Sequence, residues 1–184
     1  MTATTAAAAG AGIDPERAKD IMGSVCAPVG VVTTTEDGRT YGATVSSFAA
    51  LSIEPPLITV SFERTSYLLG RIRSAGRFGV NLLGHGQDDL ATTFARRGVD
   101  RFAETAWHLD SGLPRIEGAA GWLACDLYDT VEGGDHLLLF GLVTRVARVD
   151  LPPLIYAHRT FGTHSRFGDR KRPLIADVIA ACSC

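Results

Sequence analysis

The stretch GWLACDLYDTVEGGDHLLLFGLVTRVARV, Gly121–Val149, decides the fold class of this sequence. Two runs of β-forming residues flank the tetrapeptide Glu132-Gly133-Gly134-Asp135, whose composition is typical of a turn. The pattern predicts two long antiparallel strands joined by a tight connection. A histidine, His136, stands at the start of the second run, directly before the apolar residues Leu137–Phe140.

The position of His136 has two interpretations. In the first, the glycines form an ordinary hairpin turn, and the histidine is simply exposed where the strand begins. In the second, His136 faces a cleft and aligns a ligand, while Asp135 orients its ring by a hydrogen bond or forms the turn. The residues alone leave both interpretations open.

Shorter β segments lie on both sides of this pair. A second hairpin is predicted around Glu36-Asp37-Gly38, between VGVVTTT and RTYGATVSS. Further strands are predicted for PPLITVSF and RFGVNLL, and a strand or hairpin for PPLIYAHRTFGTH. The segment 99–118 gives mixed signals and is expected to be a loop held in place by Trp107.

Helical signals are few and short. Asp14-Pro15 is a good helix start, and the amphipathic segments SYLLGRIRSAG and QDDLATTFARRG are expected to end at Gly76 and Gly98. Because strands predominate and do not alternate regularly with helices, the sequence predicts a mainly β protein, a barrel or sandwich with peripheral helices.

Composition limits the possible functions. The chain has 184 residues, 46% hydrophobic and 21% charged, with a net charge of −2. This balance suits one folded domain and provides no positive electrostatic field that would attract nucleic acid. The sequence contains no run of about 18 apolar residues, the length that a membrane-spanning helix needs. Four cysteines without C-x-x-C spacing predict neither a disulfide framework nor a metal site. We expect a cytoplasmic domain at 14–167, with a disordered arm at 1–13 and a tail at 168–184.

Polar side chains gather where predicted strands end. They are Thr44, Ser46 and Ser47 after one strand, and Ser61, Arg64, Thr65 and Ser66 after another. Hydroxyls, a guanidinium and the free N–H groups of a helix start suit a phosphate. Asn81 interrupts a strand, and its amide could meet the edge of a heterocycle. For each serine or threonine alone, a role in a turn or helix cap is the simpler interpretation.

The blocks GATVSSFAALSIEPPLITVSF, RFGVNLL and GLPRIEGAAGWLACDLYDTVEGGDHLLLFGLV together resemble the flavin-reductase-like family, over about Met22 to Thr163. The most specific elements are G-x-T-x-S-S-F followed by S-x-x-P-P-L, and G-D-H followed five residues later by Gly141. One departure is Pro28, which stands where the family usually has a glycine at the entry to its first strand.

The resemblance implies an FMN-binding split barrel of Greek-key topology, a homodimer with one flavin per subunit near the interface. It implies the following flavin-binding residues: Thr44, Val45, Ser46, Ser47, Phe48, Ser61, Phe62, Arg64, Thr65, Ser66, Asn81, His85, Gln87, Phe94 and Ala95. It implies that the nicotinamide nucleotide contacts His136, oriented by Asp135, together with Ala50, Leu51 and Phe161.

The activity implied is an NAD(P)H:flavin oxidoreductase. It would transfer hydride from NADH, or NADPH, to FAD or FMN, with the flavin as an exchangeable substrate. The reduced flavin would pass to a separate oxygenase, with natural-product biosynthesis as one setting. Two alternatives on the same barrel stay open: a pyridoxamine-phosphate-type oxidase with tightly held flavin, and a flavin- or haem-binding sensor without catalysis.

Overall fold

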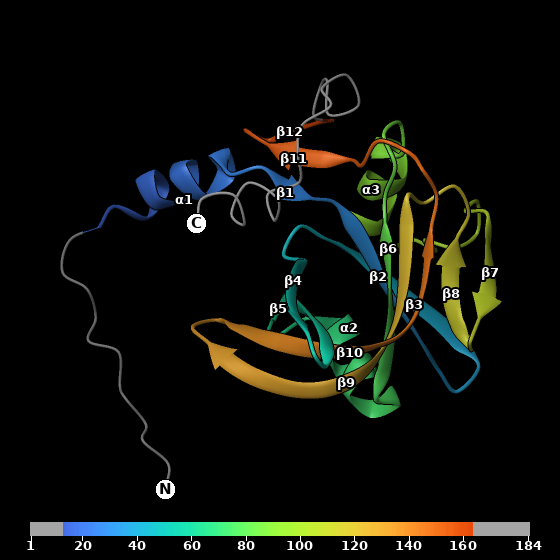
Figure 1. Cartoon of the computed structure of the whole chain (residues 1–184). Helices are drawn as coiled ribbons and strands as arrows, with labels where there is room; N and C mark the ends of the chain where they lie inside the picture. The colour runs from blue at the N-terminus through green and yellow to red at the C-terminus, as the bar shows by residue number, and fades with distance from the viewer. Residues whose placement is uncertain (1–12, 164–184) are drawn as a thin grey trace, which may run out of the picture.

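A curved antiparallel sheet of seven strands forms the frame of the protein, whose computed structural model describes residues 13–163 (Figure 1). Its strands are β2 (Gly30–Glu36), β3 (Arg39–Val45), β4 (Ala49–Ile53), β5 (Pro56–Glu63), β6 (Arg77–Leu82), β9 (Gly121–Gly133) and β10 (His136–Arg148). They lie in the order β3-β2-β6-β9-β10-β5-β4, so β3 and β4 are the two edges. The mainly β class predicted from the sequence is confirmed.

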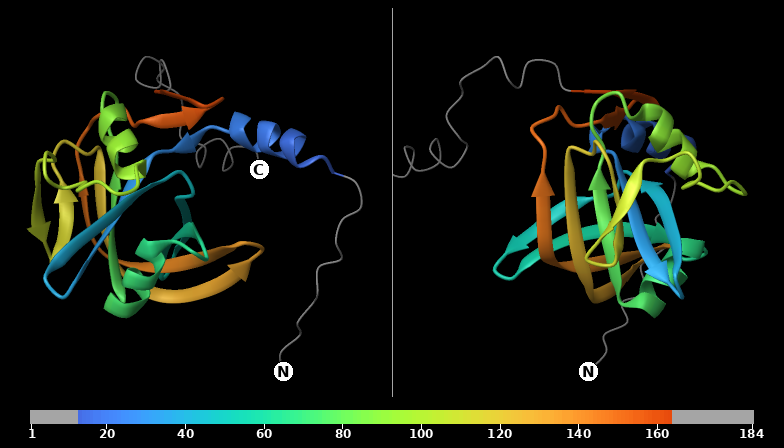
Figure 2. Two further views of the ribbon diagram at one scale, coloured as in Figure 1. Left: turned by 180° about the vertical axis from the view of Figure 1, so that it is seen from behind. Right: turned by 90° about the vertical axis from the view of Figure 1, so that its right-hand side faces the viewer.

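Two smaller sheets and three helices complete the described part of the chain (Figure 2). The smaller sheets are β1 (Ala27–Pro28) with β11 (Ile155–Ala157) and β12 (Thr160–Gly162), and β7 (Trp107–Asp110) with β8 (Leu113–Ile116). The helices are α1 (Pro15–Ser24), α2 (Tyr67–Ala75) and α3 (Asp88–Ala95). Within residues 13–163, no helix has the length and apolar character needed to cross a membrane.

The hairpin of β9 and β10 is the centre of the sheet, as its sequence predicted. Each strand has 13 residues, and His136 pairs with Gly133, which leaves Gly134-Asp135 as the turn. Gly134 has a φ of 61°, a conformation that glycine adopts without strain. Irregular pairing after Phe140 bends the strands and helps the sheet to curve.

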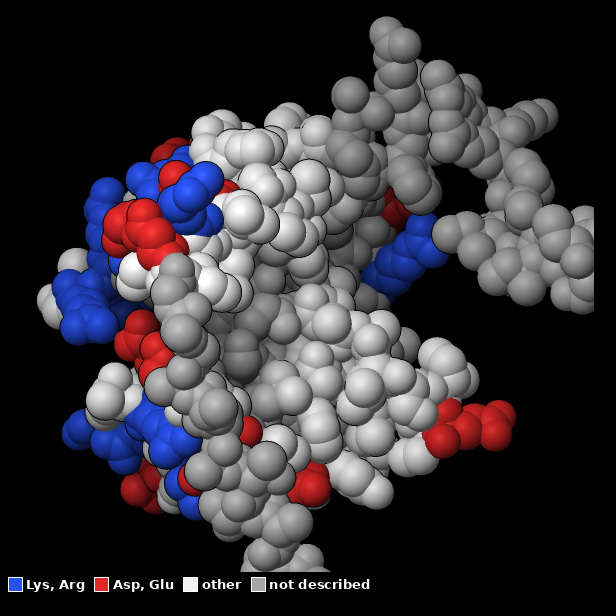
Figure 3. All heavy atoms as spheres, turned by 90° about the vertical axis from the view of Figure 1, so that its left-hand side faces the viewer, with Lys and Arg blue, Asp and Glu red and all other residues white. Residues whose placement is uncertain are grey.

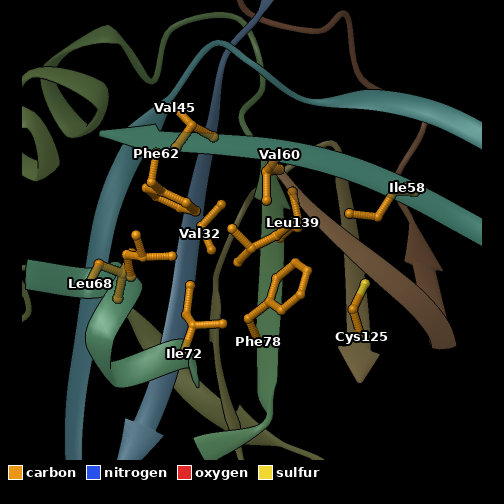
Figure 4. Packing of buried hydrophobic residues seen from close by; sticks show 12 residues of the cluster. Val32, Val45, Ile58, Val60, Phe62, Leu68, Ile72, Phe78, Cys125 and Leu139 are labelled. Atoms are coloured by element: carbon orange, nitrogen blue, oxygen red, sulfur yellow. The ribbon is translucent and has the colours of Figure 1, made fainter. Parts of the chain in front are cut away.

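The core fills the concave side of this sheet (Figure 4). Phe78 from β6, Leu139 from β10 and Val32 from β2 are fully buried there, and α2 closes one end with Ile72. A second cluster packs the opposite face of β2 against α3, with Val31 as the β2 member. Since successive side chains of a strand point to opposite faces, β2 is apolar on both sides.

Local signals set most of the boundaries. The β2–β3 turn has positive φ at Asp37 and Gly38, as a two-residue hairpin of this twist requires. Asp14 caps α1 by accepting a hydrogen bond from the Glu16 N–H, and Gly76 ends α2 with a φ of 67°. Helix α3 instead ends at Ala95, three residues before the glycine expected to stop it.

One expectation about the connections was wrong: the segment 99–118, predicted as a loop, contains the β7–β8 hairpin. The edge strand β4 (AALSI) was not among the predicted strands. Neither segment has the β-branched alternation that predicts a strand; β8 is held by hydrogen bonds with Thr33 and Asn81, and β4 pairs with the following strand β5. The expected arm at 1–13, apart from Ile13, and the tail at 168–184 lie outside the described residues.

Candidate active site

A cavity of about 900 Å³ lies over the outer edge of β3. It is bounded by the β3–β4 connection, the start of α2 and the end of α3, and His136 of β10 also lines it. Ten of the fifteen flavin-binding residues expected from the resemblance are in its wall: Thr44, Val45, Ser46, Ser47, Ser61, Phe62, Thr65, Ser66, Phe94 and Ala95. Segments that are far apart in the sequence thus share one hollow.

The outer edge of β3 offers backbone groups to this cavity. Since β3 is the last strand of the seven-stranded sheet, one row of its N–H and C=O groups has no neighbouring strand. Arg101 donates to the Gly42 carbonyl, which shows that the backbone groups of Gly42 face outward. The two-residue period of a strand places those of Thr44 on the same side. Outward N–H and C=O groups can pair with the polar edge of a heterocyclic ring.

Two of the expected hydroxyls hold the frame of the site. The Thr44 hydroxyl donates to Ala91 O of α3 at 2.6 Å, which fastens the helix to β3. The Ser47 hydroxyl donates to Ser61 O and accepts from Ser61 N, both at 3.0 Å, which fixes the β3–β4 connection against β5. Ser46 is exposed to the cavity instead. Its hydroxyl is therefore free to meet a ligand.

The start of α2 is suited to an anion. The N-cap residue Ser66 makes no side-chain hydrogen bond to the helix, so the first N–H groups of α2 are left without that partner. These groups carry the positive end of the helix dipole, and Thr65, Ser66, Tyr67 and Leu68 all line the cavity. A phosphate bound here would accept hydrogen bonds from these N–H groups.

His136 lies at the β10 end of the cavity and is oriented by its neighbour. Its Nδ1 lies 2.7 Å from Asp135 Oδ1, and the histidine side chain is 43% exposed. Asp135 O also accepts a hydrogen bond from Arg64 N at 3.0 Å, which ties the turn to the end of β5. The hydrogen bond and charge of His136 hold the pKa of Asp135 below its usual value. Nε2 is thus the ring nitrogen left for a ligand.

Five expected flavin-binding residues do not line the cavity: Phe48, Arg64, Asn81, His85 and Gln87. Arg64 forms an exposed ion pair with Glu132 at 3.3 Å. Gln87 accepts from Gly84 N at 2.8 Å and donates to Glu117 O at 3.2 Å, so its amide closes a local loop. Its side chain serves the fold around α3.

Asn81 is a structural residue in this fold. It is fully buried, and its Nδ2 donates to Val31 O at 3.2 Å and Pro114 O at 3.3 Å. Its Oδ1 accepts from Ile116 N at 2.7 Å. The expectation that this amide meets a heterocycle needs correction, because the amide joins β2, β6 and β8 instead.

The remaining expected nucleotide contacts lie elsewhere. Ala50 and Leu51 are exposed on the edge strand β4, outside the cavity wall. Phe161 of β12 packs its ring against Tyr156 of β11, with centroids 5.2 Å apart. Of the residues expected to contact the nicotinamide nucleotide, the structure brings only His136 to the cavity.

The cavity also has a wall that the sequence did not indicate. Tyr41, Tyr67 and the segment 97–102 line it, although that segment carried no recognisable motif. Phe102 offered the one usable signal, an aromatic residue in an otherwise polar connection. Its ring packs between Phe94 and Trp107, at centroid distances of 5.1 Å and 5.3 Å.

Comparisons with known proteins identify a family model and relatives that match most of this chain. A family model described as flavin reductase like domain matches residues 22–165. A probable flavin reductase of Rhizobium meliloti (strain 1021) is 37% identical over 152 residues, which are 82% of this chain and 49% of the relative. The chain therefore spans about half the length of that protein.

Two further proteins are similar over more of their length. The reductase subunit HsaB of a flavin-dependent monooxygenase from Mycobacterium tuberculosis is 36% identical over 138 residues, 74% of each chain. The solved structure of the Streptomyces globisporus C-1027 NADH:FAD oxidoreductase SgcE6, in complex with NAD and FAD fragments, superposes with a TM-score of 0.81 at 28% identity. That match covers 87% of this chain and 100% of the other. The chain therefore belongs to the flavin-reductase-like family, which confirms the resemblance drawn from its motifs and the enzyme class, a flavin reductase, that the resemblance implied.

Proposed function

We propose that this flavin reductase uses NADH to reduce FAD or FMN bound in the cavity over β3 and releases the reduced flavin to a separate oxygenase. The observation that carries the proposal is the junction of three features in one cavity: a free strand edge, an uncapped helix start and an oriented histidine. They match the three parts of the ligands, namely a flavin ring, its phosphate and a nicotinamide.

The residues present fit a flavin. The outward backbone groups of Gly42 and Thr44 would pair with the ring's polar edge, and the exposed hydroxyl of Ser46 lies beside them. The phosphate would lie at the start of α2, next to Thr65 and Ser66. Transfer of hydride from nicotinamide to flavin is chemistry that the two cofactors supply when their rings stack. The share of this chain is to bind and align them, which lowers the barrier by roughly 7–11 kcal/mol in favourable systems.

His136 would position the nicotinamide. Its ring stands at the mouth of the cavity and is held by Asp135, so its free Nε2 can contact the nucleotide without rearrangement. The other two expected contacts on β4 would reach the same nucleotide only from outside the cavity wall.

The oxygenase is proposed from the names of the relatives. Several are described as the reductase subunit or component of a monooxygenase, among them a trigonelline monooxygenase and a 4-nitrophenol 4-monooxygenase. A reductase of this kind needs a partner, because free reduced flavin otherwise reacts with oxygen. Because the reduced flavin must reach this partner, the proposal treats the flavin as an exchangeable substrate.

We further propose a homodimer. The edge strand β4 has no charged residue over Ala49–Ile53, and its Leu51 and Ile53 are 51% and 83% exposed. Tyr128 and Val131 of β9 are exposed as well, and this side of the molecule shows a broad area without charge, bordered by charged side chains (Figure 3). An unprotected apolar edge invites pairing with another chain. A second copy, related by a twofold axis, would cover it.

The first test is an assay of NADH oxidation under air with traces of FAD, FMN or riboflavin. We expect rapid loss of the nicotinamide absorbance that depends on the added flavin. No loss with any flavin, and none with NADPH, would support the sensor instead. Flavin retained through dialysis, with turnover of an amine, would support the oxidase.

A further inference from the structure

The cavity continues past the places that a flavin ring and one phosphate would need. Along β3, its wall runs from Val45, where the β3–β4 connection begins, to Tyr41 and Thr40. Four residues of a strand span roughly 13 Å. At the Tyr41 end, the lining consists of Tyr41 and Tyr67 on one side of the strand and Arg97, Asp100 and Arg101 on the other.

An aromatic ring at this end is fixed in place but left open. Tyr67 and Tyr41 pack edge to face, with centroids 5.6 Å apart, and Arg71 Cζ lies 4.8 Å from the centroid of Tyr67. Arg71 Nη2 also donates to the Tyr67 hydroxyl at 3.0 Å, and its guanidinium pairs with Glu36. Despite these contacts, Tyr67 is 62% exposed. A pre-ordered, exposed tyrosine is suited to stacking on a planar base.

A cation without a carboxylate partner faces the same end. Among the described residues, the guanidinium of Arg101 donates to the carbonyl oxygens of Arg96 and Gly42, and no acidic side chain forms an ion pair with it. Asp100 is the nearest acid in sequence, and its Oδ1 accepts from Phe102 N at 3.0 Å. Partial burial lowers the pKa of Arg101, which shows that its charge is partly desolvated. An anionic ligand would compensate it.

We propose that this end of the cavity binds the adenylate half of FAD, so that the enzyme prefers FAD to FMN. The adenine stacks on Tyr67, and the pyrophosphate lies between Arg101 and the start of α2. The inference rests on the proposed function, because it places the flavin ring at the His136 end.

The test measures dissociation constants of FAD, FMN and riboflavin for the intact protein and its variants, from the quenching of flavin fluorescence. We expect wild type to bind FAD at least tenfold more tightly than FMN. Tyr67→Ala should weaken FAD roughly fivefold or more, since loss of one base-stacking contact has an effect of this size, and FMN less than twofold. Tyr67→Phe keeps the ring and should retain FAD binding.

Arg101→Gln tests the charge. Since Arg101 also holds the 97–102 segment against β3, a purely structural role would weaken FAD and FMN equally. A role in binding the pyrophosphate would weaken FAD several-fold more than FMN, and the loss would shrink at high salt. Arg148→Gln is the matched control, because Arg148 is 85% exposed and lies outside the cavity.

Two results separate the inference from the proposed function. Equal affinities for FAD and FMN in wild type, or equal losses of both in Tyr67→Ala, would overturn the adenylate site while flavin-dependent NADH oxidation persisted. Failure of every flavin to bind or to be reduced would overturn the proposed function itself.

Discussion

Gly141 shows how a single residue of the sequence motif serves the fold. An ideal Cβ on this glycine would lie 2.5 Å from Phe78 Cζ and 3.0 Å from Cys125 Cβ, and both neighbours are fully buried. We therefore expect Gly141→Ala to lower the free energy of unfolding by about 1–3 kcal/mol, as overpacked cores do. Urea denaturation would measure it. Gly133→Ala is the control, because a Cβ added there would have no other atom within 4 Å; equal losses in both variants would contradict the packing explanation.

The two interpretations of His136, as a ligand contact and as an ordinary turn residue, predict different kinetics. If it positions the nicotinamide, His136→Ala should raise the KM for NADH about tenfold, a change of about 1.4 kcal/mol, and leave the flavin KM nearly unchanged. Steady-state kinetics with each substrate varied would show this split. Asp135→Asn keeps a hydrogen-bonding partner for the ring and should have a smaller effect. Equal changes in both KM values would return His136 to the role of a turn residue.

At the scale of elements, an ion pair joins the end of β2 to α2. A hydrogen bond from Ser74, then the hydrogen bond of Arg71, hold the pKa of Glu36 below its ordinary value of 4.5. A lowered folded-state pKa stabilises the protein above 4.5, and this contribution is lost as the pH falls through the folded value. Glu36→Gln should therefore melt below wild type at pH 7, and the difference in Tm should shrink as the pH falls below 4.5. A difference in Tm between the variant and wild type that does not change with pH would contradict this explanation.

The β7–β8 hairpin depends on Asn81 in β6. Removing this amide leaves the buried Ile116 N–H without its acceptor, and one unsatisfied group costs about 1–3 kcal/mol, whereas Pro114 O keeps its hydrogen bond from the Thr33 hydroxyl. We expect Asn81→Ala to be destabilised by at least that amount and to exchange the amide hydrogens of β8 faster, with unchanged FAD affinity in the folded fraction. A selective loss of flavin binding at full stability would restore the ligand interpretation of this residue.

The hairpins and helix ends show what the sequence could predict. The β2–β3 and β9–β10 hairpins and the end of α2 follow from turn residues that act locally, and all three were predicted. The β7–β8 hairpin was not, because it is held by Asn81, a residue distant in the sequence, and such a contact leaves no period in the local sequence. Strand β4 was not predicted either: it pairs with the next strand along the chain, β5, but its AALSI sequence lacks β-branched alternation.

At the scale of the whole molecule, the curvature of the sheet assembles the cavity. It brings the end of β3, the start of α2 and His136 together, which is why six of the seven polar residues named at predicted strand ends lie in the wall. The sequence could not distinguish ligand-facing hydroxyls from those that fasten the frame, such as Thr44 and Ser47. Nor could it locate the segment 97–102, whose place is fixed by the bond from Arg101 to Gly42 O.

The uncharged side around β4 gives the last prediction. If a second copy covers this edge, Ile53→Glu would place a charge in the interface, and burial of an unpaired charge is strongly unfavourable. Sedimentation velocity at micromolar concentration should show a dimer for wild type and a monomer for Ile53→Glu. Val146→Glu is the control: Val146 is also exposed, at 67%, but lies near the far end of β10, away from the β9–β10 turn. A monomeric wild type, or a variant that still dimerises, would show that β4 is not the interface of a homodimer.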